Sequence, residues 1–177
     1  MKLYVVRHGE TDWNKKKFMQ GNTDVSLNET GISQAKMISE KLKDVNFDVC
    51  YSSPLSRAYD TASIICNGKV NIQIDNRLEE RELGEYEGKE SSLYNSEYYW
   101  NLKIDSSDKG VESPKDLLKR ISSFYDDLLE KHNDEVILIV SHGAIVRGLN
   151  FVINGYDENT KIYEFDVPNC CVFEYEI

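Results

Sequence analysis

Short apolar runs alternate along the chain with stretches in which apolar residues recur at helical spacing. The runs predict β-strands at residues 2–6, 47–53, 70–75 and 135–141. The amphipathic stretches predict helices at residues 28–45, 54–68, 113–134 and 144–155. Residues 161–177 are predicted to form two further strands, which separate at Pro168-Asn169.

Alternation of strands and helices predicts an α/β fold with three layers, in which a mostly parallel central sheet is covered by helices on both faces. A chain of 177 residues fits one domain, residues 1–177. Segment 88–112 does not follow the alternation and is predicted to be a small cap excursion above the sheet. Its aromatic residues are expected to serve packing more than substrate binding: Tyr94, Tyr98, Tyr99 and Trp100.

The charge balance limits the classes of partner. The chain has 21 basic and 31 acidic residues, a formal net charge of 21 − 31 = −10, which argues against nucleic acid and anionic membranes. A small anionic substrate remains compatible with this charge, because it responds to the local site. No apolar run approaches ~20 residues and the N-terminus has no signal-peptide pattern, so we expect no membrane span and a cytoplasmic location. No feature of the sequence predicts an oligomeric state.

The four cysteines show neither metal-ligand spacing nor a CxxC pattern. They are expected to be reduced, buried residues of strands: Cys50, Cys66, Cys170 and Cys171. No cluster of acidic residues and histidines has metal-ligand spacing either, so no metal and no cofactor are predicted.

Polar residues with chemical potential follow each of the four predicted parallel strands. In order they are Arg7-His8, then Ser52, Ser53 and Arg57, then Glu80, and then Ser141-His142. Ligands of open α/β sheets bind outside the carboxyl ends of the strands, so these side chains are expected to meet there. Arginine presents a planar fork of donors that matches phosphate oxygens. Gly9 and Gly143 are expected to let the backbone approach a ligand closely.

The motifs at these positions resemble those of the histidine phosphatase superfamily, the phosphoglycerate-mutase-like proteins. They are "RHGETDWN", "QGNTDVSLNETGISQA", "SSPLSRAYDTA", "LEERELGEYEG" and "VSHGAIVRG". The resemblance covers nearly all of the chain and is weakest at residues 89–112. It implies that His8 is the nucleophile, that Arg7, Arg57 and His142 hold the phosphoryl group, and that Glu80 gives and takes the proton. It further implies substrate contacts at Asn14 and in the loop Gln20-Gly21-Asn22-Thr23.

Elementary chemistry agrees with these roles. Phosphoryl transfer passes through a loose, in-line transition state, which cationic donors stabilise. Attack on phosphorus requires a neutral imidazole, and cations close to His8 favour that form. A partly desolvated glutamate with a raised pKa can protonate the leaving oxygen and then activate water.

Several of these polar residues also have simpler interpretations. Arg57 could be a helix-surface residue, and Glu79, Glu82 or Glu85 could replace Glu80 as the acid. Ser52 and Ser53 are expected to cap a strand end or contact phosphate, and not to act as nucleophiles. His132 is expected to be a solvated histidine at a helix end.

The predicted function is a metal-independent phosphomonoesterase that hydrolyses a small phosphorylated metabolite through a phosphohistidine. The alternatives are a phosphoglycerate mutase and, less favoured, a non-catalytic phosphate-binding regulator. Mutases of the family usually carry an Arg-Arg pair in the insertion, whereas segment 88–112 contains no arginine and only Lys89, Lys103 and Lys109 as basic residues. Sugar phosphates, phosphoserine, a ribazole phosphate and nucleotides all stay open as substrates.

Overall fold

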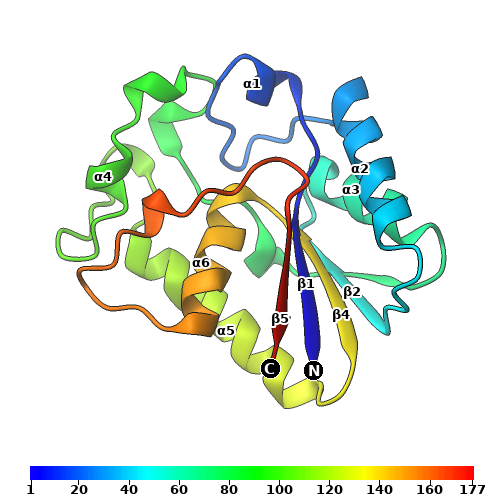
Figure 1. Cartoon of the computed structure of the whole chain (residues 1–177). Coiled ribbons are helices and arrows are strands. Elements are labelled where there is room, and N and C mark those ends of the chain that lie inside the picture. Colours follow the sequence, from blue (N-terminus) through cyan, green and yellow to red (C-terminus); the bar gives the residue numbers. More distant parts are fainter.

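A five-stranded sheet forms the centre of the protein, whose computed structural model describes all residues 1–177. Its strands are β1 (Lys2–Arg7), β2 (Val49–Ser52), β3 (Ile72–Ile74), β4 (Val136–Ser141) and β5 (Val172–Glu176). Their order is β3-β2-β4-β1-β5. The first four run parallel, and β5 pairs antiparallel with β1 at one edge (Figure 1). The prediction of a mostly parallel α/β sheet is confirmed.

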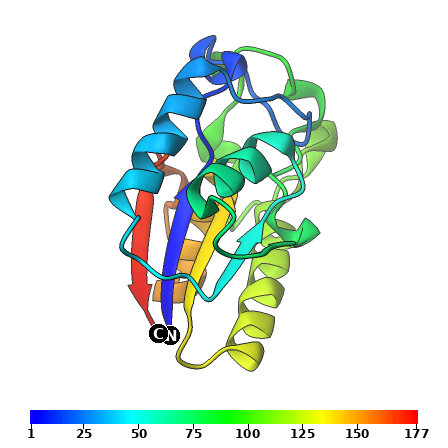
Figure 2. The ribbon, with the colours of Figure 1, turned by 90° about the vertical axis from the view of Figure 1, so that its right-hand side faces the viewer.

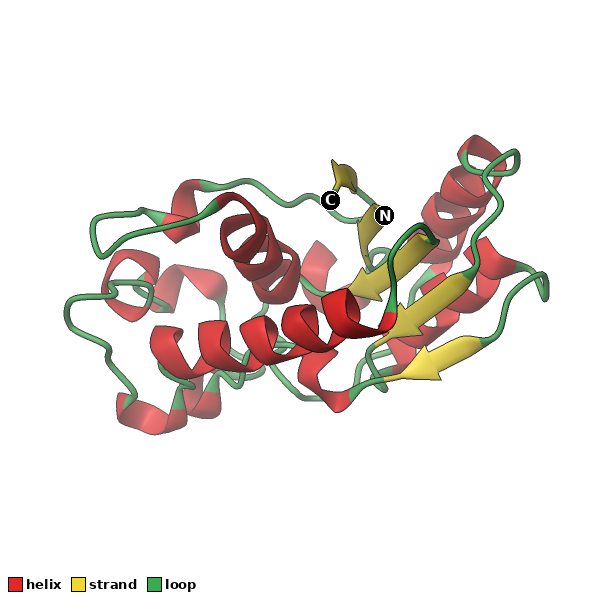
Figure 3. Ribbon diagram, turned by 90° about the horizontal axis from the view of Figure 1, so that it is seen from below, coloured by secondary structure: helices red, strands yellow, loops and turns green.

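Helices cover both faces of this sheet. α2 (Glu29–Lys41) and α3 (Ser56–Cys66) lie on one face, and α5 (Pro114–Lys131) and α6 (Gly143–Asn154) lie on the other (Figure 2). Figure 3 shows the same two helical layers on either side of the strands. Alternate residues of β1 serve the two cores: Leu3 and Val5 pack under α5 and α6, whereas Tyr4 and Val6 pack under α2 and α3. Burial on both faces explains why the central strands β1 and β4 have continuous apolar runs.

The register of the strands brings the two His-Gly motifs together. β1 and β4 pair from Lys2 opposite Val136 to Arg7 opposite Ser141, so both strands end at the same level. The residues that follow, His8 and His142, therefore leave the sheet side by side, and the N–H of His8 donates to the carbonyl of Ser141 at 2.9 Å. Parallel pairing thus explains why the motif occurs twice.

Segment 88–112 forms a cap, as predicted. The short helices α1 (Asp12–Lys15) and α4 (Ser96–Tyr99) lie beyond the carboxyl ends of the strands (Figure 1). A small cluster of apolar side chains holds the cap together: Leu83, Tyr86, Tyr99 and Val111. The rings of Tyr94 and Tyr99 stack at 4.9 Å between centroids. Tyr99 and Trp100 are 2% and 4% exposed, which fits a packing role, whereas Tyr98 is 36% exposed.

Two predicted features of the periphery are wrong. The first of the two C-terminal strands does not form, because Ile162 and Val167 bury their side chains in the core under α5 and α6 and pair with no strand. The four cysteines are free, as predicted, but only Cys50 lies in a strand: Cys66 ends a helix, Cys170 and Cys171 precede β5, and Cys171 is only half-buried. None of the helices has the length and apolar character required to cross a lipid bilayer.

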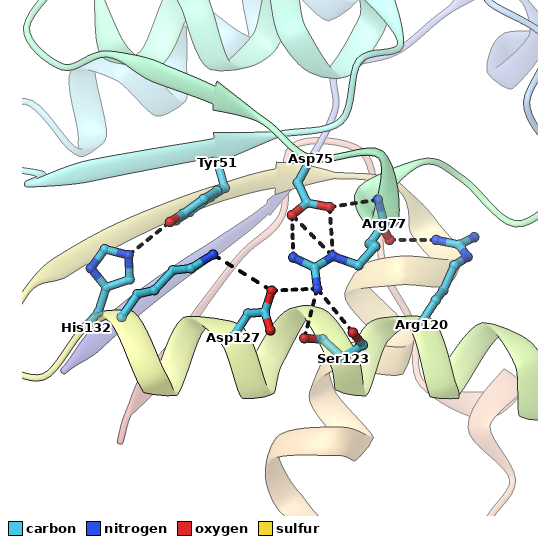
Figure 4. Close-up of polar contacts among 8 residues, drawn as sticks. Tyr51, Asp75, Arg77, Arg120, Ser123, Asp127 and His132 are labelled. Atoms are coloured by element: carbon cyan, nitrogen blue, oxygen red, sulfur yellow. Dashed lines mark hydrogen bonds and ion pairs between the residues drawn. The ribbon is translucent and has the colours of Figure 1, made fainter.

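His132 is not solvated, which corrects another expectation. It ends α5, but its side chain is only 10% exposed. Its Nε2 lies 3.0 Å from the hydroxyl of Tyr51, which reaches it from β2 (Figure 4). In the same polar layer Arg77 pairs with Asp75 at 2.7 Å and with Asp127 of α5 at 2.9 Å. The chain that leaves β3 is thereby fixed against α5, and this chain leads to Glu80.

Candidate active site

A pocket of about 230 Å³ opens at the carboxyl ends of the parallel strands. It gathers most of the residues predicted from the sequence: Arg7, His8, Asn14, Gln20, Gly21, Arg57, Glu80 and Gly143. His142 and Thr23 are not among its lining residues. Arg81, Tyr94, Ser96, Trp100 and Arg147 also line it. The pocket therefore lies between the sheet and the cap.

The imidazole of His8 is oriented for attack through one nitrogen. Nδ1 lies 2.7 Å from the carbonyl oxygen of Gly9, to which it can donate only as Nδ1–H. In the neutral ring Nε2 then carries the free lone pair. Burial, followed by the cations Arg7 and Arg57, holds the pKa of His8 well below 6.5. A neutral ring with a free Nε2 is the form that attack on phosphorus requires.

Gly9 is small for a different reason from the one predicted. A Cβ at Gly9 would lie 2.5 Å from the carbonyl oxygen of Gly31 at the start of α2, so the glycine allows the two segments to pack. At Gly143 a Cβ would meet Arg7 and Glu80 at 3.7 Å. Gly143, unlike Gly9, borders the pocket.

Two arginines supply the positive charge around His8. Arg7 donates from Nη1 to the carbonyl of Val167, while its buried Nε has no hydrogen-bond partner. An unpaired buried donor is costly, and an anion in the pocket would satisfy it. Arg57 is fully buried at the start of α3. Burial is the largest influence on the pKa of both groups and lowers it.

Arg57 also shapes the loop at residues 20–23. It donates to the carbonyls of Gly21 at 2.7 Å and Thr23 at 2.8 Å. Gly21 has φ +52°, a conformation that glycine adopts without strain. The hydroxyl of Thr23 donates to Glu87 at 2.6 Å, outside the pocket. Thr23 therefore holds the loop and is not among the residues that line the pocket, and its contact with a substrate stays a prediction.

His142 supports Arg57 in this structure. It is the N-cap residue of α6, and its ring centroid lies 5.1 Å from that of His8. Its Nδ1 accepts from Nε of Arg57 at 3.2 Å, so Nε2 carries the proton toward the hydroxyl of Ser53 at 2.8 Å. Burial and the neighbouring Arg57 hold its pKa well below 6.5. A direct contact of His142 with a phosphoryl group stays a prediction.

Glu80 is the one carboxylate among the residues that line the pocket. Its Oε1 accepts from the backbone N–H of Arg81 at 2.9 Å and from that of Ala144 at 3.1 Å. Its Oε2 lies beside Gly143. Neither Glu79, Glu82 nor Glu85 lines the pocket. The geometry thus favours Glu80 over its neighbours as the acid.

The segment that carries Glu80 is fixed by Arg120 of α5. Its guanidinium donates to the carbonyls of Arg77 at 2.6 Å, Glu79 at 3.0 Å and Glu80 at 3.2 Å. It also holds the carboxylate of Glu112 through two contacts, of 2.7 and 2.9 Å. Figure 4 shows Arg120 reaching from α5 to the carbonyl of Arg77. Glu80 therefore projects from a rigid support.

Asn14 and Gln20 line the opposite wall of the pocket. Oδ1 of Asn14 accepts from the N–H of Thr11 at 3.1 Å and from Nδ2 of Asn169 at 3.2 Å. These bonds orient the amide and leave its NH₂ group without a partner. Gln20 is held by the hydroxyl of Thr11 at 2.9 Å. Both residues line the pocket, and their contact with a substrate stays a prediction.

Sequence reasoning missed two arginines of the pocket, Arg81 and Arg147. Arg81 donates to the carbonyls of Glu112 and Tyr99 and to the hydroxyl of Tyr94, and so fastens the cap to the sheet. Arg147 lies four residues after Gly143 in α6, on the same face of that helix. This spacing was a usable signal for Arg147. The structure contains no group of three or more His, Cys, Asp or Glu side chains that could hold a metal ion.

A neutral histidine between two arginines, with a carboxylate on the same pocket, defines a site of the phosphoryl-transfer class. The model of the histidine phosphatase superfamily (branch 1) matches residues 3–177, and the chain belongs to that family.

Relatives and solved structures agree with this assignment. The chain is 38% identical over 157 residues to "Phosphoglycerate mutase-like protein 4" of Arabidopsis thaliana, covering 83% of this chain and 68% of the relative. It is 33% identical over 174 residues to "Uncharacterized phosphatase PhoE" of Bacillus subtilis, covering 97% and 86%. A phosphoserine phosphatase from Entamoeba histolytica, solved with phosphoserine, superposes with a TM-score of 0.86 at 29% identity, over 98% and 89% of the two chains. These similarities support an enzyme of the phosphatase type.

Proposed function

We propose that the protein is a phosphomonoesterase that hydrolyses a small phosphorylated metabolite through a phosphohistidine at His8. The observation that carries this proposal is the orientation of His8. Its Nδ1 is engaged by the carbonyl of Gly9, its Nε2 is free, and Arg7, whose buried Nε has no partner, lines the same pocket. A lone pair beside an unsatisfied cationic donor suits attack on a phosphate ester.

In the first step Nε2 of His8 attacks phosphorus, and the bond from phosphorus to the ester oxygen breaks. Arg7 and Arg57 stabilise the charge on the equatorial oxygens. Glu80 gives its proton to the leaving oxygen, so the alcohol departs neutral and the phosphoryl group stays on His8. Glu80 is then an ionised carboxylate, stabilised by the N–H groups of Arg81 and Ala144.

In the second step water attacks the phosphoryl group on the face that the alcohol has left. Glu80 takes a proton from this water while the bond from phosphorus to Nε2 breaks. Inorganic phosphate is released, His8 returns to its neutral form, and Glu80 is protonated again. The low pKa of His8 favours this return, because the leaving imidazole needs no added proton.

The size of the pocket supports a small substrate. Its volume of about 230 Å³ lies below the ~300–1,000 Å³ that is typical of sites for drug-sized ligands. The relatives named as phosphatases, among them a phosphoserine phosphatase of Hydrogenobacter thermophilus at 30% identity over 177 residues, support hydrolysis.

Rapid-quench labelling tests the proposal. An aryl phosphate labelled on phosphorus should give an acid-labile, base-stable adduct on His8 before steady-state turnover begins. His8→Ala should lose the adduct and nearly all turnover while keeping its circular dichroism spectrum. A burst of product without label on His8 contradicts the proposal.

The same preparation separates hydrolysis from the two alternatives. Release of phosphate from 3-phosphoglycerate supports the phosphatase, whereas its conversion to 2-phosphoglycerate without net release identifies a mutase. Phosphate binding without turnover of any ester identifies a regulator. The first of these results is the one we expect.

A further inference from the structure

Arg147 is a cation of the pocket that the proposed chemistry does not use. It projects from α6 into the space between the cap and the site, where it lines the pocket together with Trp100 and Tyr94. Arg7 and Arg57 already serve the phosphoryl group, and Arg81 is used by the cap. The role of Arg147 is therefore unassigned.

Two contacts hold the guanidinium of Arg147 in place, a hydrogen bond at its edge and an aromatic ring at its face. Its Nε donates to the carbonyl of Phe165 at 2.9 Å. Its Cζ lies 5.4 Å from the ring centroid of Trp100, within the range of a cation–π contact. Trp100 is itself buried and also contacts the guanidinium of Arg81, at 4.6 Å. Arg147 is thus fixed before any ligand arrives.

The donors that remain on Arg147 have no partner in the protein. No hydrogen bond or ion pair uses Nη1 or Nη2, although Asp166 and Glu80 are close enough to influence the group electrostatically. Arg81 differs, because both of its Nη atoms and its Nε donate to protein oxygens. A pre-oriented pair of free Nη groups matches the two oxygens of a planar carboxylate.

The position of Arg147 sets the distance between this fork and the reacting phosphorus. Gly143 lies against Arg7 and Glu80, where the phosphoryl group would sit. Arg147 follows four residues later, about 6 Å along α6 at ~1.5 Å per residue. The pocket that Arg147 shares with His8 holds only about 230 Å³, so the part of the substrate that joins the ester oxygen to a carboxylate has to be short.

The charge of the pocket also leaves room for a second anion. Four arginines line it, and the proposed mechanism has Glu80 protonated when the ester binds, so the pocket then carries a formal charge of +4 in a chain whose net charge is −10. A phosphomonoester dianion compensates about two of these charges. A further negative charge on the substrate would balance part of the remainder.

We propose that Nη1 and Nη2 of Arg147 bind a carboxylate on the leaving group, so that the enzyme selects phosphate esters of short hydroxy acids or hydroxy amino acids. This inference rests on the proposed phosphatase function and names its substrate class. Arg147 acts as a specificity residue, because it contacts the part of the substrate that does not react.

Two matched pairs of substrates test the inference. O-phosphoserine and O-phosphoethanolamine differ by the carboxylate alone, and in glycerol 3-phosphate a neutral hydroxymethyl group replaces the carboxylate of 3-phosphoglycerate. The native enzyme should prefer the acidic member of each pair in kcat/KM by roughly 10–100-fold, the range of charge-assisted hydrogen bonds. In Arg147→Met this ratio should collapse toward one, mainly through a higher KM for the acidic member. Arg147→Lys should restore part of the ratio, because it keeps the charge and loses the fork.

Lys119→Met is the matched control, since it removes an exposed positive charge of α5 outside the pocket. It should keep the ratio of the native enzyme. Hydrolysis of an aryl phosphate reports the proposed phosphatase function separately from the selectivity.

Three results would overturn the inference while aryl phosphate turnover still upheld the phosphatase. One is a native enzyme with no preference within either pair. Another is an Arg147→Met variant that keeps the preference, or that loses both members of a pair equally. The third is a three-carbon bisphosphate that is preferred over both acidic esters in an Arg147-dependent manner, which would assign the fork to a second phosphate. A native enzyme that does not hydrolyse the aryl phosphate would instead contradict the proposed function.

Discussion

Replacing Glu80 with glutamine removes an acidic proton from the site and keeps most of its hydrogen bonds. Oε1 of Glu80 accepts from two backbone N–H groups, those of Arg81 and Ala144. The amide oxygen of glutamine can occupy the same place and accept both. No buried donor loses its partner, so we expect the free energy of unfolding to change by less than about 1 kcal/mol.

The catalytic loss should depend on how strongly the leaving oxygen needs a proton. An alkyl alkoxide is strongly basic, so an alkyl phosphate should suffer the full loss of general acid catalysis, roughly 10²–10⁴-fold. At about 1.36 kcal/mol per factor of ten, this corresponds to ~2.7–5.4 kcal/mol in the activation barrier. A nitrophenolate leaves without protonation, so its transfer to His8 should slow much less.

Single-turnover rates give the fair comparison, because breakdown of the phosphohistidine also needs Glu80 as a base. With the aryl ester we therefore expect a burst followed by slow turnover. Glu82→Gln is the matched control, since Glu82 is exposed and does not line the pocket. It should change either rate by no more than a few-fold. An equal loss for alkyl and aryl esters in Glu80→Gln would refute the acid role and indicate positioning.

Three further outcomes follow from the structure. Burial keeps His8 and His142 neutral in the folded protein, whereas both take up protons near pH 6.5 in the unfolded chain. The free energy of unfolding should therefore fall below pH 6.5, by up to about 1.4 kcal/mol per pH unit for each histidine. Urea unfolding measures this slope, and His8→Gln should reduce it by about half; an unchanged slope contradicts the cause. Arg120→Met leaves the half-buried Glu112 unpaired, so it should cost about 2–3 kcal/mol and lower Tm by roughly 4–12 °C in a thermal melt, an effect that an unchanged Tm would refute. Because arginines supply the charge, EDTA should leave turnover intact and vanadate should inhibit by forming an adduct at His8; activity lost to EDTA and restored by Mg²⁺ would contradict this mechanism.

The order of strands and helices could be predicted because each strand is a short apolar run between strong helix signals. The same signals place the site, since residues that follow parallel strands converge at one edge of the sheet. Arg7, His8, Arg57 and Glu80 meet there as expected. Local pattern and global topology are consistent in this part of the chain, which explains why reasoning from sequence succeeds.

The roles of individual polar groups were less predictable, because they depend on partners that are remote in sequence. The hydroxyl of Tyr51 contacts the ring of His132, 81 positions away in the sequence, and keeps it from being solvated. Glu87 accepts a hydrogen bond from the hydroxyl of Thr23, which lies 64 positions away in the sequence. His142 bonds to Arg57 and Ser53 from opposite halves of the chain. The periodicity of the sequence does not predict such contacts. The prediction of a strand in the C-terminal segment was wrong for the same reason, because Ile162 packs in the core.

The cap shows most clearly why the substrate could not be deduced from composition. Counting arginines in segment 88–112 gives none, yet its Trp100 contacts two guanidinium groups that come from other elements. Arg81 uses its donors to hold the cap, whereas Nη1 and Nη2 of Arg147, which lines the pocket, have no partner in the protein. The segment therefore supplies an aromatic surface on which an arginine of α6 is oriented, and the proposed selectivity would arise between the two segments. Substitutions at Trp100 should consequently change selectivity through Arg147, without any contact between the indole and the reacting phosphorus.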